Sequence, residues 1–179
     1  MVEQGSSFNP ESEKIDNLDS LLERFDSQTD KIPESLRQKS TDELFELWKQ
    51  GVDLYKNLYP ADMRTITDRD ERNRRYLDFT KVAAVNRLIN NIVSDRLDQR
   101  ISGPDESMRA LQLKQQEVQW KQDLTQVEVQ RATSAGEFSK AEELQKTYWL
   151  LAKESFQAGQ EIGDLSFKNL QEKWSKPIA

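Results

Sequence analysis

Apolar residues return at intervals of three and four along most of the chain, the spacing of one face of an α-helix. The first such stripe follows a polar stretch over residues 1–13 that we interpret as disordered. It predicts an amphipathic helix at about 14–26, with the apolar members Ile15, Leu18, Leu22 and Phe25. A helix this short is marginal alone, so it either packs on its own domain or folds into a groove of a partner protein. Residues 27–39, with Pro33, are predicted to be a linker, which makes 1–39 an acidic and mostly disordered arm.

The second stripe predicts a longer helix over residues 40–58. Ser40 and Glu43 have the spacing of a capping box at its start, and Pro60 ends it. Its inner face is rich in aromatic residues and consists of Leu44, Leu47, Trp48, Gly51, Leu54, Tyr55 and Leu58. Gly51 either lets a neighbouring helix approach closely or has no special role.

A third helix is predicted from about 68 to 100, and its apolar residues are not confined to one face. They occur on several sides between Tyr76 and Val93. A helix of this kind is either central in its domain or part of a subunit interface. Together with the preceding helix it forms a predicted helical core over residues 40–101.

Two further runs predict a long antiparallel helical hairpin over residues 105–162. The first arm keeps a heptad register through Ala110, Leu113, Trp120, Leu124 and Val127. The second arm alternates spacings of three and four through Ala141, Leu144, Tyr148, Leu151, Ser155, Ala158, Ile162 and Leu165. The small residues of "TSAGE" join the runs, so we expect the two stripes to bury against each other. Residues 163–179 are predicted to be a short C-terminal helix and a tail.

Two features of this hairpin leave alternatives open. The first arm carries seven glutamines: Gln112, Gln115, Gln116, Gln119, Gln122, Gln126 and Gln130. We favour a solvated face built from good helix formers over a polar packing surface against other chains. In the second arm, "YWLLA" at 148–152 is apolar on more than one face and needs more cover than one helix provides. Trp149 lies beside the heptad positions and is either an interface anchor or packed against residues 76–93.

Composition fits an all-α protein and narrows the possible chemistry. Apolar residues make up 35% and charged residues 32% of the chain, with only six Gly and five Pro, which suits long helices around a thin core. The chain contains neither Cys nor His, which excludes disulfides, thiolate metal sites and both Ser-His-Asp and Cys-His catalysis. The glycines form no phosphate-binding loop. We therefore predict a protein that is not an enzyme and has no cofactor, no metal and no small-molecule substrate.

The densest charged segment is "TDRDERNRR", at the start of the third predicted helix. Its carboxylates do not make a metal site, because arginines neutralise them and the spacing of a calcium loop is missing. The arginines are Arg69, Arg72, Arg74 and Arg75. We favour a helix N-terminus whose acids pair with solvent-facing arginines. The alternative is phosphate contact by these arginines, with Lys81 and Arg87 further along the helix.

Charge and hydropathy bear on the partners. The net charge is -6, and all of the excess acid lies in residues 1–60, which hold 13 acidic and 7 basic side chains. This disfavours a general duplex-DNA binder, which needs a basic face. No run approaches the ~20 apolar residues of a membrane span, and the N-terminus lacks the pattern of a signal peptide. We expect a cytoplasmic or virion-internal protein that is neither secreted nor embedded in a membrane.

These observations favour a non-catalytic structural or adaptor protein that acts through helix-helix contacts with protein partners, possibly itself, within an oligomer or a larger assembly. The alternative is an accessory subunit in a nucleic-acid transaction that uses the arginines above. The predicted protein-interface residues are Ile15, Leu18, Leu22, Phe25, Trp48, Tyr55, Tyr148, Trp149 and Leu151.

Overall fold

The computed structural model describes residues 18–58, 65–102 and 105–174, and its regular elements in these ranges are all helical. This confirms the all-α fold class. The elements are α1 (Leu18–Arg24), the 3-10 turn η2 (Thr29–Lys31), α2 (Ile32–Gln38), α3 (Thr41–Leu58), α4 (Arg69–Ser102), α5 (Glu106–Ala135) and α6 (Phe138–Trp174).

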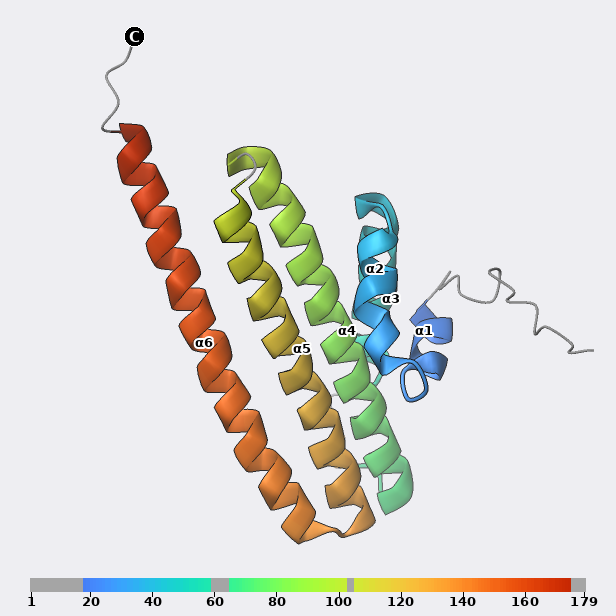
Figure 1. The fold of residues 1–179 in the computed structure, drawn as a ribbon. Helices are drawn as coiled ribbons and strands as arrows, with labels where there is room; N and C mark the ends of the chain where they lie inside the picture. Colours follow the sequence, from blue (N-terminus) through green and yellow to red (C-terminus); the bar gives the residue numbers. More distant parts are fainter. Residues whose placement is uncertain (1–17, 59–64, 103–104, 175–179) are drawn as a thin grey trace, which may run out of the picture.

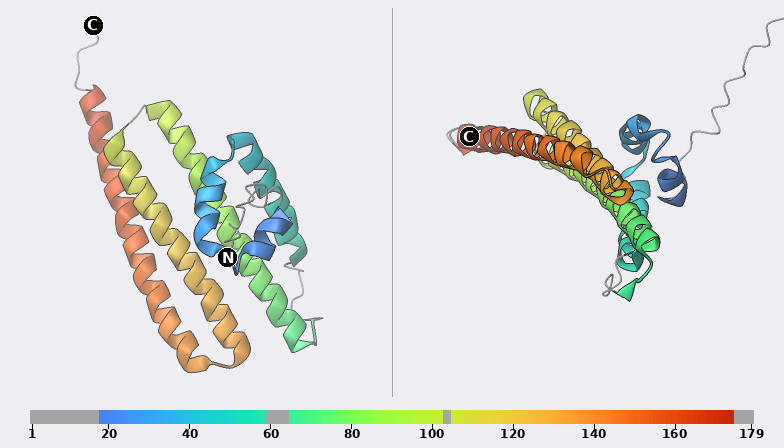
Figure 2. Two further views of the ribbon diagram at one scale, coloured as in Figure 1. Left: turned by 45° about the vertical axis from the view of Figure 1, so that its right-hand side comes forward. Right: turned by 90° about the horizontal axis from the view of Figure 1, so that it is seen from below.

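The three long helices α4, α5 and α6 lie side by side in chain order, each antiparallel to the one before (Figure 1). α6 packs on α5, and α5 packs on α4, while α1, α2 and α3 gather at the other side of α4. The left-hand view of Figure 2 keeps this order and places α6 at the outer edge of the layer. The third predicted helix is therefore central, and α6 has one long helix as its main neighbour.

α1 belongs to the core of the bundle. Phe25, just after α1, meets the Trp120 ring of α5 edge to face, with ring centroids 5.9 Å apart. The neighbouring Asp26 forms ion pairs with Lys81 of α4, at 2.9 Å, and with Arg131 of α5. The first helix thus packs on its own domain, one of the two arrangements that the sequence allowed.

Residues 27–39 are not the predicted linker, because η2 and α2 occupy most of this segment. Ile32 and Leu36 of α2 are buried in the same apolar cluster as Phe25. Pro33 stands in the first turn of α2, where a missing N–H breaks no helical hydrogen bond. The arm predicted for residues 1–39 is accordingly helical in much of its described part, and residues 1–17 lie outside the described part.

The start of α3 confirms the predicted capping box. The backbone N–H of Ser40 donates to Glu43 Oε2 at 2.7 Å, and the N–H of Glu43 donates back to Ser40 Oγ at 3.2 Å. Further along, Gly51 is buried where α3 crosses α4. A Cβ atom at position 51 would lie only 2.0 Å from Oδ1 of Asn86. Gly51 therefore leaves room on α3 for the Asn86 side chain of α4, which agrees with the predicted close approach of a neighbouring helix.

The predicted hairpin is formed by α5 and α6. Gly136 ends α5 with φ of 79°, a left-handed conformation that glycine adopts without strain. The N–H of Glu137 donates to the carbonyl of Ala132 at 2.8 Å, which completes the cap. At the opposite end, Asp105 caps α5 and also accepts a 2.6 Å hydrogen bond from Asn169 Nδ2 of α6. The pKa of Asp105 is lowered by these hydrogen bonds, and the largest effect comes from the Met108 N–H.

α6 continues without a break to Trp174, so the short separate helix predicted after residue 162 is one end of a longer helix.

The apolar stripe predicted for the first arm of the hairpin, α5, does not face α6. Trp120, Leu124 and Val127 pack in the core with α1 and α4, and Leu113 is exposed. The buried Val118 and Val129 lie on the opposite side of α5, about half a turn round the helix from Trp120 and Val127. α5 is thus sandwiched between α4 and α6.

The glutamine-rich face of α5 is not wholly solvated, contrary to the prediction, because several of its glutamines are packed within the chain. Gln112, Gln116 and Gln122 are buried. Four polar pairs form a ladder between the antiparallel α4 and α5. The pairs are Arg87–Asp123 at 3.0 Å, Asn91–Gln119, Asp95–Gln116, and Asp98–Gln112 at 3.4 Å. This part of the glutamine-rich face is a polar packing surface, as in the alternative interpretation, but its partner is α4 of the same chain.

Candidate interaction surface

Four exposed aromatic side chains lie in one line along α6. Phe138, Trp149, Phe156 and Phe167 are 66, 64, 65 and 62% exposed. They are separated by eleven, seven and eleven residues, which are close to three, two and three full turns of an α-helix. All four therefore point to the same side of the helix, over a length of about 44 Å at 1.5 Å per residue. We call this set the aromatic stripe.

The stripe is exposed because α6 packs on a different face. The inward face of α6 carries the small buried residues Ser155 and Ala158, with Tyr148 and Leu151 half-buried beside them. Gly159 lies near this face, and a Cβ there would come within 3.0 Å of the Gln115 side chain of α5. Small residues let α5 and α6 approach closely, while the large apolar residues of α6 remain at the edge of the contact.

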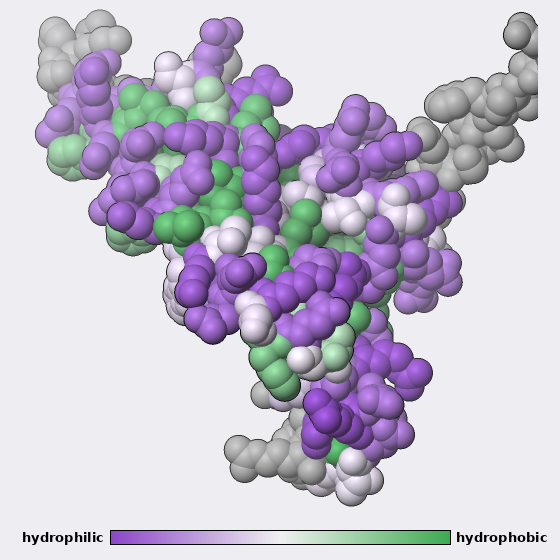
Figure 3. Space-filling view, turned by 60° about the horizontal axis from the view of Figure 1, so that its bottom comes forward, coloured by the Kyte–Doolittle hydropathy of each residue, from purple (hydrophilic) through white to green (hydrophobic). Residues whose placement is uncertain are grey.

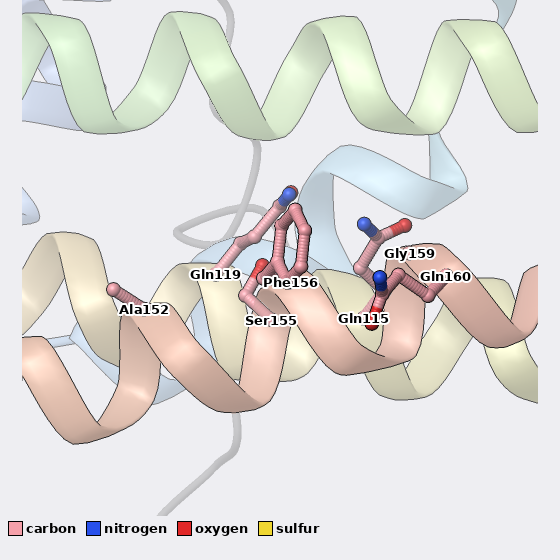
Figure 4. A pocket seen from close by; sticks show the side chains of 7 residues that line it. All are labelled: Gln115, Gln119, Ala152, Ser155, Phe156, Gly159 and Gln160. Carbon is pink, nitrogen blue, oxygen red and sulfur yellow. The ribbon is translucent and has the colours of Figure 1, made fainter.

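A shallow groove of about 490 Å³ runs beside the stripe, between α5 and α6. Its lining residues are Gln115, Gln119, Ala152, Ser155, Phe156, Gly159 and Gln160 (Figure 4). The Phe156 ring stands over the groove next to the Gln119 amide (Figure 4). The groove therefore combines an apolar wall from α6 with amide donors and acceptors from α5, and offers no charged side chain.

Outside α6, the exposed large apolar side chains of the described residues are spread over three helices. Viewed with the end that carries the α5–α6 turn brought forward, apolar patches alternate with hydrophilic side chains over the long helices (Figure 3). Among the described residues, the exposed large apolar side chains outside α6 are Phe45, Tyr55, Leu97 and Leu113, from α3, α4 and α5. Six of the ten exposed large apolar side chains in the described ranges belong to α6.

The structure separates the predicted interface residues into three groups. Leu18 and Phe25 are buried in the chain's own core, and Leu22 and Trp48 are partly buried against it. Tyr55 is 39% exposed and packs on Phe79 of α4, with ring centroids 4.2 Å apart. Ile15 lies outside the described residues. Leu18, Leu22, Phe25 and Trp48 therefore hold the bundle together and leave little surface to a partner, whereas Tyr55 keeps an exposed edge.

The third group lies on α6. Tyr148 is half-buried and meets the Trp149 ring edge to face at 5.4 Å, while Leu151 is half-buried beside α5. Trp149 points outward and does not pack against residues 76–93 as the alternative proposed, since 64% of it is exposed. Phe138, Phe156 and Phe167 were not predicted as interface residues, because they do not belong to the apolar stripe with spacings of three and four. The signal that identifies them is the longer repeat of seven and eleven.

The arginines at the start of α4 are interleaved with acidic residues and do not form an unbroken basic face. At 100° per residue, Arg69, Arg72 and Arg75 lie within an arc of about 120° round the helix, and Arg74 points away from that arc. Arg75 pairs with Glu71 at 2.6 Å, and Arg72 donates to the Ile66 carbonyl at 3.3 Å. Asp68 accepts from the backbone N–H groups of residues 70 and 71, as a helix cap does. Lys81 and Arg87, which the nucleic-acid alternative also needs, are paired with Asp26 and Asp123.

Within the described ranges, no cluster of three or more acidic side chains has the geometry to hold a metal ion. No described helix is both long and apolar enough to cross a membrane. Comparison with family models, with curated proteins and with solved structures finds no match for the chain.

Proposed function

We propose that this protein is a non-catalytic structural or adaptor protein that binds another protein chain through the aromatic stripe of α6. The observation that carries the proposal is the alignment of four large aromatic residues, each more than 60% exposed, along one side of a single helix. Aromatic residues are enriched at protein interfaces, and Trp is prominent among the residues that dominate binding energy.

The surface is large enough to matter. A Phe or Trp side chain buries roughly 150–250 Å² when fully covered, so the four exposed rings leave on the order of 500 Å² of aromatic surface in water. Polar side chains separate the rings, so this area is distributed along the helix and is not gathered in one continuous patch. The length of α6, 37 residues, suits a partner that is itself a helix or a helical hairpin, because two helices can remain in contact along many turns.

The proposal is tested by photo-crosslinking in the cells that make the protein. A photoreactive phenylalanine analogue replaces Trp149 in the full chain, and a matched chain carries it in place of Leu150. Leu150 is 70% exposed on the same helix but points about 100° away. We expect a defined protein-protein cross-link from position 149 and little or none from position 150. Equal labelling from both positions would show that the contact is not specific to the stripe, and no labelling from either would show that the stripe binds no protein.

A further inference from the structure

We propose that the partner of the aromatic stripe is a second copy of this chain, with the two α6 helices antiparallel across a two-fold axis between Ala152 and Lys153. This inference rests on the proposed function, because it names the chain that covers the same surface. It is argued from the symmetry of the stripe, from the space around α6 and from the area that the contact would bury.

The stripe reads the same in both directions. The spacing of eleven, seven and eleven places its midpoint between residues 152 and 153. Across a two-fold axis at that point, Phe138 lies opposite Phe167 of the second copy, and Trp149 lies opposite Phe156. A two-fold interface must be self-complementary, since each residue meets its partner twice. All four aromatic residues of the stripe satisfy this condition, which a stripe adapted to an unrelated helix has no reason to satisfy.

The positions between the aromatic residues follow the same symmetry. Gln145 lies opposite Gln160, so two amides that can donate and accept hydrogen bonds face each other. Glu142 lies opposite Gly163, which has open space around its Cα, since a Cβ there would meet nothing within 4 Å. Lys153 is exposed beside the axis, and its long side chain can extend to solvent along the rim of the contact. The axis also sets the two copies of Lys153 side by side and brings Glu142 near Asp164 of the second copy, so like charges meet at the solvent-exposed rim of the contact, where water and salt screen them.

α6 has room for this neighbour. The inward residues Ser155 and Ala158 lie about 130° round the helix from the stripe. A second α6 can therefore lie along the stripe without displacing α5, and the two bundles then diverge on either side of the axis. The groove beside Phe156 (Figure 4) offers space for the rim of the second helix next to Gln115 and Gln119.

The contact also has sufficient area. The aromatic rings of two copies contribute on the order of 1,000 Å² of surface, before the intervening residues and the flanks of both helices are added. Stable interfaces bury about 1,200 Å² or more in total, and an antiparallel contact about 44 Å long reaches that range.

The first experiment measures mass in solution and distances between spin labels on the full chain. The sequence has no Cys, so a single Cys at the exposed Ser139 or Gln157 carries one label per copy. In the antiparallel pair, the labels at 139 are separated by about 40 Å along the helix, and those at 157 by about 15 Å. A parallel pair would place both sets at roughly the distance between two helices, about 10 Å. We expect a dimer with one long and one short distance.

The second experiment compares Trp149→Asp with Leu150→Asp, because both residues are exposed neighbours and only the first belongs to the stripe. We expect Trp149→Asp to raise the dimer Kd at least about 30-fold, the size of one hot-spot loss, while Leu150→Asp leaves it within a few fold. Circular dichroism checks that both variants remain helical. A monomer, a parallel pair, or a dimer that Trp149→Asp leaves intact overturns the inference.

These outcomes separate the inference from the proposed function. If the purified chain is a monomer but position 149 cross-links to a different protein in cells, the second-copy inference fails and the proposed function stands. If position 149 gives no cross-link to any chain, both fail.

Discussion

Arg87 of α4 and Asp123 of α5 form an ion pair, with Nη1 and Oδ1 3.0 Å apart, in which the carboxyl is buried and the guanidinium is half exposed. Burial raises the pKa of Asp123 to about 7, although the positive charge of Arg87 opposes the shift. The desolvation of the carboxylate therefore outweighs its attraction to a partner that remains in contact with water.

This relationship predicts how stability depends on pH. Between about pH 4 and pH 7 the folded protein holds a proton at Asp123 that the unfolded chain has released, so the stability that this group contributes falls as the pH rises through that window. Asp123→Asn keeps the shape of the side chain and removes the titration. We expect the variant to match the parent near pH 4, where Asp123 is protonated in both states, and to exceed it by about 1–3 kcal/mol at pH 8.

Urea unfolding at the two pH values measures the effect. Asp164→Asn is the control, because Asp164 is exposed on α6. A loss of stability in Asp123→Asn at pH 8 would mean that the ion pair contributes more than its burial costs, contrary to the prediction.

A second prediction concerns the attachment of α1. Phe25 is 1% exposed and contacts Trp120, so its truncation to Ala leaves a cavity in the core shared by α1, α4 and α5. We expect Phe25→Ala to lower the free energy of unfolding by about 3–5 kcal/mol. Phe167→Ala is the matched control, because it removes the ring of a phenylalanine that is exposed. It should change the free energy of unfolding by less than about 1 kcal/mol under conditions where the protein is monomeric. Equal effects in urea unfolding would show that Phe25 is not part of the core.

Two of the glycines within the long helices, Gly51 and Gly163, should respond in opposite ways to replacement by Ala. At Gly51 a Cβ would collide with the Asn86 side chain, and the Asn86 Oδ1 atom is already buried without a hydrogen-bond partner. We expect Gly51→Ala to destabilise the protein by about 1–3 kcal/mol. Gly163→Ala meets open space in a helix interior and should stabilise the dilute monomer by up to about 1 kcal/mol. Thermal unfolding of both variants gives the comparison, and a stabilised Gly51→Ala would contradict the close approach of α3 and α4.

The sequence predicted most of the helices, because apolar spacing, the capping box at Ser40 and the glycine turn at 136 are local signals. It could not predict which helix each face meets. Trp120 and Val127 have the spacing of a hairpin seam whether they face α6 or α4, and only the three-dimensional packing decides between these neighbours. Pro33 likewise permits either a linker or the first turn of a helix, and the burial of Leu36 selects the helix.

The sequence also predicted only part of the candidate interaction surface, for a related reason. Trp149 stood out because it falls beside the heptad positions, but a side chain beside a seam can be covered by another part of the chain. The exposure of Phe138, Phe156 and Phe167 depends on α6 being the outer helix of the layer, which no local pattern records. The polar ladder was missed because glutamine is equally common on solvated helices, and its pairing with α4 depends on the register of two helices.

That ladder supports the last prediction. Gln116 Nε2 donates to Asp95 Oδ2, and Gln116 Oε1 accepts from Arg37 at 3.3 Å, so one side chain joins α5 to both α4 and α2. Burial raises the pKa of Asp95 to about 6, with a further contribution from Asp98. Replacing Gln116 by Leu leaves a half-buried carboxyl without this donor, and we expect a loss of about 1–3 kcal/mol that is larger at pH 8 than at pH 5.

The double variant Asp95→Leu/Gln116→Leu removes both members of the pair and should recover part of this loss, because no buried acceptor then lacks a donor. Urea unfolding of the parent, the two single variants and the double variant forms a complete cycle. If the change in unfolding free energy of the double variant equals the sum of the changes in the two single variants, the two side chains do not interact. A positive coupling would show that the Asp95–Gln116 pair is a polar contact that helps to fix the register of α4 against α5. Because α6 packs on α5, this register also bears on the position of α6, where the aromatic stripe is exposed.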